Sequence, residues 1–163
     1  MANETTVAAA KSGAASKSAH GEAWGALTRT QAAVSGRLQE ALTESGFPPL
    51  PWYEVLSTVA DAPEARMRMG DLAEAMVISR GGLTKLVDRL VKAGLLERTF
   101  CETDRRVSYA TLMPAGDDLL AEMRPVVVAE LRIAFEAKLS VEEANDLRDT
   151  LDRVRSSACG GGH

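Results

Sequence analysis

The stretch from Ser79 to Arg106, SRGGLTKLVDRLVKAGLLERTFCETDRR, decides the fold because it holds a helix, a turn and most of a hairpin. Its first half repeats apolar residues at spacings of three and four, the period of a helix with one buried face. These residues are Leu83, Leu86, Val87, Leu90 and Val91. Gly94 then follows, where helices commonly end in a left-handed residue. We therefore predict a helix with one apolar face and one polar or basic face.

Two strand-like runs come after this helix, at residues 95–100 and 107–112, and a polar loop carrying two arginines joins them. A helix with a basic face, followed by a hairpin with a basic tip, is typical of the winged helix-turn-helix arrangement. The major groove of DNA admits an α-helix, and the loop can reach the neighbouring minor groove. The sequence therefore predicts a mainly α fold with a small β-hairpin wing, and a DNA-binding regulator.

The residues predicted to contact DNA lie at the start of the helix, on its polar face and at the hairpin tip. They are Ser79, Arg80, Gly81, Thr84, Lys85, Arg89, Arg105 and Arg106. The alternative is ordinary, since most polar helix faces are simply solvated and many hairpin tips are charged. Gly81 and its neighbour either fray the first turn or allow close approach to the phosphate backbone. Asp104, two residues before Arg106, favours an arginine held for insertion into the minor groove.

The net charge of −4 over 163 residues is unusual for a protein that binds nucleic acid, but its distribution is not. Between Ser79 and Arg106, seven Lys or Arg stand against four Asp or Glu, which gives +3 and leaves −7 for the rest of the chain. A basic segment on an acidic body still produces a local attractive field for DNA.

Several other classes of protein are disfavoured. No apolar run approaches the roughly 18 residues of a membrane span and no signal core opens the chain, so we expect no membrane partner and a cytoplasmic protein. Cys101 and Cys159 form neither a disulfide framework nor, with the two histidines, a metal cluster. His20 and His163 fall in expected tails. We expect no catalytic residue, metal or cofactor, and no enzyme.

Long helices are predicted on both sides of the winged lobe, each with a narrow apolar stripe suited to packing against another helix. The predicted organisation is a disordered tail, an N-terminal helix, the winged lobe, C-terminal helices and a second tail, at residues 1–20, 21–49, 50–113, 114–157 and 158–163. Ser140 and Glu143 form a capping box that opens the last helix. The simplest partner for such stripes is a second copy of the chain. We therefore predict a homodimer that binds a pseudo-palindromic operator.

Shorter signals predict the elements between these helices. Pro51 suits the first turn of a second helix, and residues 66–69 alternate like an edge strand. Gly70 is expected to open a short helix over residues 71–76. Val77 should lie in the following turn without positive φ, because a β-branched residue is strained there. Ser79 is the expected N-cap of the basic-faced helix.

At this point the chain resembles the MarR (multiple-antibiotic-resistance regulator) family over about residues 24–155. The segments that carry the resemblance are MGDLAEA at 69–75, SRGGLTKLVDRL at 79–90, AGL at 93–95, DRR at 104–106 and LMPAG at 112–116. The resemblance implies an obligate dimer formed by the terminal helices and DNA contacts from the helix and wing. It also implies, in many members, a small aromatic or phenolic ligand that releases the operator from a repressor.

The resemblance leaves three points open. Trp24, Trp52 and Tyr53 are candidate ligand contacts, although aromatic residues at helical spacing are more often core. Cys101 stands where the family often has an acid, which raises the alternative of a thiol-based redox sensor. Met113 stands where the family usually has a capping Thr. Besides a ligand-responsive regulator and a redox sensor, a third possible function is a protein-interaction module, in which the winged helix docks a protein rather than DNA.

Overall fold

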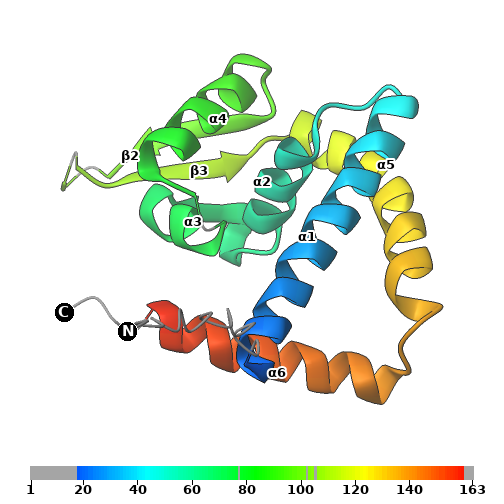
Figure 1. The fold of residues 1–163 in the computed structure, drawn as a ribbon. Coiled ribbons are helices and arrows are strands. Elements are labelled where there is room, and N and C mark those ends of the chain that lie inside the picture. Colours follow the sequence, from blue (N-terminus) through cyan, green and yellow to red (C-terminus); the bar gives the residue numbers. More distant parts are fainter. Residues whose placement is uncertain (1–17, 77, 102, 105, 160–163) are drawn as a thin grey trace, which may run out of the picture. The chain divides into compact units, whose positions relative to one another are not determined.

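The computed structural model describes residues 18–76, 78–101, 103–104 and 106–159 of the chain. The helices there are α1 (Ala19–Glu44), α2 (Leu50–Ala60), α3 (Met69–Ala75), α4 (Arg80–Lys92), α5 (Pro114–Leu131) and α6 (Val141–Cys159). The strands are β1 (Arg66–Arg68), β2 (Leu96–Phe100) and β3 (Ser108–Leu112), as Figure 1 shows. Short 3-10 and π turns occupy Pro63–Ala65 and Arg132–Glu136. The predicted mainly α fold with a small β wing is confirmed.

By its internal contacts the chain divides into two units, residues 1–32 and 33–163. The first unit is described from residue 18 onward and consists of the first half of α1. There Trp24 is 67% exposed. The second unit holds the end of α1, the other helices and the sheet.

The three strands form an antiparallel sheet in the order β1-β3-β2, so β3 is central and β1 is an edge strand as predicted. β2 and β3 pair as a hairpin, with Leu96 opposite Leu112 at its base and Phe100 opposite Ser108 toward its tip. β1 pairs through only three residues, and Arg68 lies opposite Tyr109. The sheet therefore attaches the wing to the segment just before α3.

Two apolar clusters form the core of the second unit. The larger lies between α2, α3, α4 and the sheet and includes the face of α4 predicted to be buried, namely Leu83, Leu86, Val87 and Leu90. The smaller joins the end of α1 to α5 through Leu38, Leu42, Leu50, Met123 and Val127. Burying a side chain of this size stabilises the fold by about 1.5–3 kcal/mol. These contacts fix α4 on the lobe with its polar face outward.

The junction between α1 and α2 depends on a side chain from the preceding helix. Pro49 at the N-cap of α2 makes no side-chain capping bond, and Pro51 stands in the first turn as predicted. Oε1 of Gln39 on α1 instead accepts the backbone N–H of Leu50 at 3.0 Å. This bond satisfies one of the free N–H groups at the helix start. α1 thus caps α2.

The predicted capping box of α6 is confirmed. The carboxylate of Glu143 accepts the backbone N–H of Ser140 at 2.8 Å, and Oγ of Ser140 accepts the N–H of Glu143 at 3.2 Å. These bonds lower the pKa of the Glu143 carboxyl, because the backbone N–H and the hydroxyl of Ser140 both favour its charged form.

Some predicted boundaries are wrong. His20 lies inside α1, which begins at Ala19 within the expected N-terminal tail, and α6 runs to Cys159, two residues into the expected C-terminal tail. α3 begins at Met69 rather than Asp71, so Gly70 lies inside its first turn. The tails at 1–17 and 160–163 and the turn residue Val77 lie outside the described residues.

Candidate nucleic-acid interface

The start of α4 is organised by Ser79, which is its N-cap as predicted. Oγ of Ser79 accepts the backbone N–H of Gly82 at 3.2 Å. At the other end, Gly94 has φ +76°, the left-handed conformation expected after a helix. Between these ends α4 buries its apolar face and exposes Arg80, Gly81 and Lys85 to solvent. The exposed face is therefore available to a partner of the lobe.

Thr84 is less available than the sequence suggested. Its side chain is half-buried, and its hydroxyl donates to the backbone carbonyl of Arg80 at 2.9 Å. A hydroxyl has a single proton to donate. Thr84 can therefore accept a hydrogen bond from DNA, or offer its methyl group, without disturbing this contact. It cannot also donate one.

The cations of α4 make no ion pair with the residues that the structure describes. Among the described residues, Arg80, Lys85, Arg89 and Lys92 have no carboxylate within ion-pair distance. Arg89 and Lys92 lie in the last turn of α4, where the helix dipole favours positive charge. Arg89 is nine residues from Arg80, about 13 Å along the axis. The two arginines therefore lie at opposite ends of the helix.

The hairpin tip is held by backbone contacts around Asp104. Its Oδ1 accepts the backbone N–H of Arg106 at 2.9 Å, and its carbonyl accepts the N–H of Val107 at 3.0 Å. Below the tip, the N–H of Cys101 donates to the carbonyl of Val107 at 2.9 Å. Asp104 thus fixes the backbone of Arg106, whose side chain is exposed. Arg105 lies outside the described residues.

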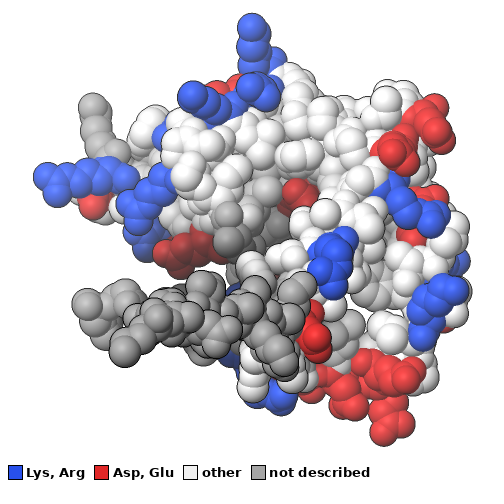
Figure 2. Space-filling model, viewed as in Figure 1, with Lys and Arg blue, Asp and Glu red and all other residues white. Residues whose placement is uncertain are grey.

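A groove of about 330 Å³ lies between α3, the start of α4 and the tip end of the wing. It brings together Arg80, Thr84 and Arg106 from the predicted set, whereas Ser79, Gly81, Lys85 and Arg89 do not line it. Figure 2 shows Lys and Arg side chains over α4 and toward the wing, and Asp and Glu side chains gathered over the start of α6. Lys and Arg side chains also lie elsewhere on this face, so the two charges are only partly separated there.

Arg98 is a residue of this region that the sequence reading missed. From β2 it pairs with Asp88 on α4 at 3.4 Å and donates to Oγ of the buried Ser108 on β3 at 3.4 Å. Its side chain is only 29% exposed. Both contacts are long, but together they connect α4 to both strands of the wing. The only signal in the sequence was that a charged residue occupies a position of the strand whose side chain has to face inward.

Cys101 directly follows β2. Its Sγ is 3.2 Å from Oγ1 of Thr103. Hydrogen bonds from the Thr103 side chain and backbone lower the pKa of the Cys101 thiol, and the charge of Asp104 opposes them only weakly. The neighbouring threonine is therefore the main cause of the lowered pKa.

The aromatic ligand candidates fall in both units of the chain. Trp52 and Tyr53 on α2 are half-buried and pack against the larger core cluster, and Tyr53 also reaches the smaller one. Trp24 belongs to the N-terminal unit.

Within the described ranges, no group of His, Cys, Asp or Glu is placed to hold a metal ion. None of the described helices is long and apolar enough to cross a membrane.

The helix, the wing and their exposed arginines define a winged helix-turn-helix DNA-binding domain. A profile of the MarR family matches residues 45–107. The chain is similar to winged-helix transcription regulators of that family, and the relatives that it matches are transcription regulators.

Three relatives illustrate the similarity. The HTH-type transcriptional regulator MhqR of Bacillus subtilis (strain 168) is 27% identical over 134 residues, which cover 81% of this chain and 88% of MhqR. Sco3205, a MarR family transcriptional regulator from Streptomyces coelicolor solved in complex with DNA, is 27% identical with a TM-score of 0.75, covering 83% of this chain and 85% of that one. CouR from Rhodococcus jostii RHA1, solved bound to p-coumaroyl-CoA, is 26% identical with a TM-score of 0.73. The match covers 86% of this chain and 96% of CouR.

Proposed function

We propose that this protein binds a specific operator as a homodimer, with α4 in the major groove and the wing at the adjacent minor groove. The observation that carries the proposal is the position of Arg80 and Arg106, which come from separate elements and line one groove without a carboxylate partner among the described residues. Lys85 extends this surface along α4. The DNA-bound structure of the similar Sco3205 supports the same use of the fold.

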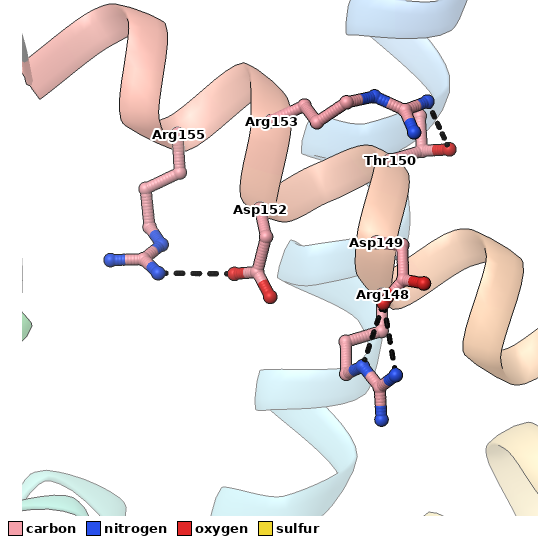
Figure 3. A network of polar contacts seen from close by, with 6 residues as sticks. All are labelled: Arg148, Asp149, Thr150, Asp152, Arg153 and Arg155. Atoms are coloured by element: carbon pink, nitrogen blue, oxygen red, sulfur yellow. Dashed lines mark hydrogen bonds and ion pairs between the residues drawn. The ribbon is translucent and has the colours of Figure 1, made fainter.

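The dimer is proposed because the apolar stripe of α6 is left exposed by the described residues of the second unit. Leu147 is 40% exposed and Val154 is 55% exposed. The charged residues of α6 bond instead to one another along the helix, as Figure 3 shows: Arg148 to Asp149 at 2.9 Å, Arg155 to Asp152 at 3.0 Å and Arg153 to Thr150 at 3.1 Å. The stripe is left for a partner, and a second copy supplies a matching stripe. Two lobes would then meet half-sites about one DNA turn apart.

We further propose that the regulator is a repressor and that a small aromatic or phenolic molecule releases it. CouR, solved with p-coumaroyl-CoA, supports a small-molecule effector in a protein of this fold. Trp52 and Tyr53 are the proposed contacts within the second unit, since both are half-buried against the larger core cluster and Tyr53 also packs against the smaller one. Trp24, which lies in the N-terminal unit, remains a prediction from the sequence alone.

The proposal is tested by sequencing the DNA that the purified protein selects from a random pool, with and without phenolic and aromatic acids. A two-fold symmetric motif that is lost in the presence of one acid supports each part of it. Selection without any sequence motif would overturn operator binding and favour a winged helix that docks protein. A motif that no acid weakens would overturn only the effector.

A second candidate function, thiol-based sensing, has one observation in its favour: the lowered pKa of Cys101, which increases the fraction of reactive thiolate. We expect the effector reading to hold, so Cys101→Ser should leave operator affinity unchanged with and without peroxide. Loss of binding in peroxide by the native protein, absent from the variant, would favour the redox reading.

A further inference from the structure

Arg68 is an exposed arginine whose position the fold leaves without an internal role. It ends β1 and occupies the N-cap position of α3, where it makes no side-chain capping bond. N-cap positions favour Ser, Thr, Asp and Asn, because their oxygens accept backbone N–H groups. An arginine carries donors only and cannot do this. Local helix chemistry therefore does not explain the residue.

Arg68 lines the same groove as Arg80 and Arg106. The three arginines come from three different elements: the end of β1, the first turn of α4 and the tip of the wing. All three are exposed, and none has a carboxylate within 4.0 Å in the part of the chain that the structure describes. A guanidinium presents its donors in a planar fork that fits the oxygens of a phosphate.

Two carboxylates, Asp71 and Glu74 of α3, also line this groove and oppose an anion there. They neutralise two of the three positive charges without pairing with any of them, so the groove keeps a net charge of +1. Such a balance weakens the attraction for small anions more than for a polyanion, which presents charge along the whole edge of the groove. The occupant that fits best is a phosphate backbone passing over the arginines.

We propose that Arg68 contacts a backbone phosphate of the bound duplex, as a DNA contact beyond the helix and wing residues. The inference rests on the proposed function, because it uses the same face of the lobe. In helix-turn-helix docking the first helix crosses the backbone beside the recognition helix, and Arg68 directly precedes α3. Because phosphate contacts carry no sequence information, Arg68 sets affinity and register rather than choice of operator.

The chain offers a matched control two residues away. Arg66 lies on the same strand and has the same charge, but its guanidinium stacks over the ring of Tyr109 at 4.0 Å and does not line the groove. Comparing Arg68→Ala with Arg66→Ala therefore separates a direct contact from a general loss of positive charge. Arg68→Lys keeps the charge and removes the fork.

The experiment measures the binding of each full-length variant to operator and scrambled duplex at 50 and 200 mM salt. Arg68→Ala should lower the affinity of the protein for the operator and for the scrambled duplex by the same factor. The ratio of affinities at the two salt concentrations should fall by roughly threefold for each lost contact. Arg68→Lys should keep most of the salt dependence, and Arg66→Ala should match the native protein. Thermal unfolding of each variant verifies that the lobe is intact.

The outcomes separate this inference from the proposed function. If Arg106→Ala lowers the salt dependence and Arg68→Ala does not, the inference is overturned and operator binding stands. If neither variant changes it, the proposed DNA face itself is wrong. An equal effect of Arg66→Ala and Arg68→Ala would also overturn the inference, since charge alone would then explain the result.

Discussion

Gly116 on α5 packs directly against the carbonyl oxygen of Leu95, the residue just before β2. A Cβ at position 116 would overlap that oxygen and crowd the side chain of Leu112. The same carbonyl accepts the backbone N–H of Met113 at 3.1 Å. The start of α5 is thereby held against the base of the wing, although its N-cap residue, Met113, makes no side-chain capping bond.

Gly116→Ala should therefore destabilise the lobe, because a methyl group forced against backbone cannot be relieved by a side-chain rotation. The expected loss in the free energy of unfolding is about 1–3 kcal/mol, measured by urea denaturation. The matched control is Gly36→Ala in the middle of α1, where a Cβ meets nothing within 4 Å. That change should instead stabilise the protein by roughly 0.5–1 kcal/mol. Equal effects of the two changes would contradict the packing argument.

Lys85 and Arg106 should differ in what they contribute to DNA binding. Lys85→Ala should cost roughly 1–3 kcal/mol on the operator and much less on scrambled DNA, if the amine reaches a guanine edge. Arg106→Ala should weaken binding to every sequence similarly and lower the salt slope by about 1 per protomer. Binding titrations of both variants on both duplexes check this. Thermal stability should hardly change, since both side chains are exposed.

The apolar stripe of α6 should carry the dimer contact. Changing both Leu147 and Val154 to Glu places two charges on the stripe and should yield a folded monomer in sedimentation. Changing Asn145 and Ser156 to Glu adds the same charges on the opposite side of α6. That control should remain a dimer. A dimeric stripe variant would show that the contact lies elsewhere.

The start of α6 should loosen in acid. Because its carboxylate accepts the bonds of the capping box, the pKa of Glu143 is lower in the folded chain than in the unfolded one. Its contribution to stability is therefore present above the unfolded value, roughly 4.3, and is lost as the pH falls through the folded value. Amide exchange of α6 measured from pH 7 to pH 3 should reveal this. In Glu143→Gln the same region should show less dependence on pH, and an unchanged profile would refute the assignment.

The sequence predicted those features whose cause is local. The spacing of Leu83, Leu86 and Leu90 gave the buried face of α4, Ser79 gave its first residue and Gly94 its end. The capping box gave the start of α6. In each case the determining contact lies within a few residues of the chain, so the pattern of residue types is sufficient.

Contacts between distant residues were not predictable in the same way. Nothing in the neighbourhood of Arg98 indicates that it meets Asp88 on a helix and Ser108 on another strand. The role of Gly116 depends on a carbonyl 21 positions earlier, and Arg68 joins Arg80 and Arg106 only because the sheet places β1 beside β3. The candidate DNA residues themselves follow from position on α4 and the wing. Which of them share a groove follows from the fold.

The bond between Gln39 and the backbone of Leu50 has a consequence for how a signal could travel. The turn between α1 and α2 is short and itself bonded, with the N–H of Phe47 donating to the carbonyl of Leu42 at 2.9 Å. Two prolines, Pro48 and Pro49, stiffen the remaining link. Rotating the lobe about the turn between α1 and α2 would break the hydrogen bond from the N–H of Leu50 to Oε1 of Gln39. The junction between α1 and α2 is therefore rigid. An effector that repositions α4 must rotate the end of α1 together with the lobe.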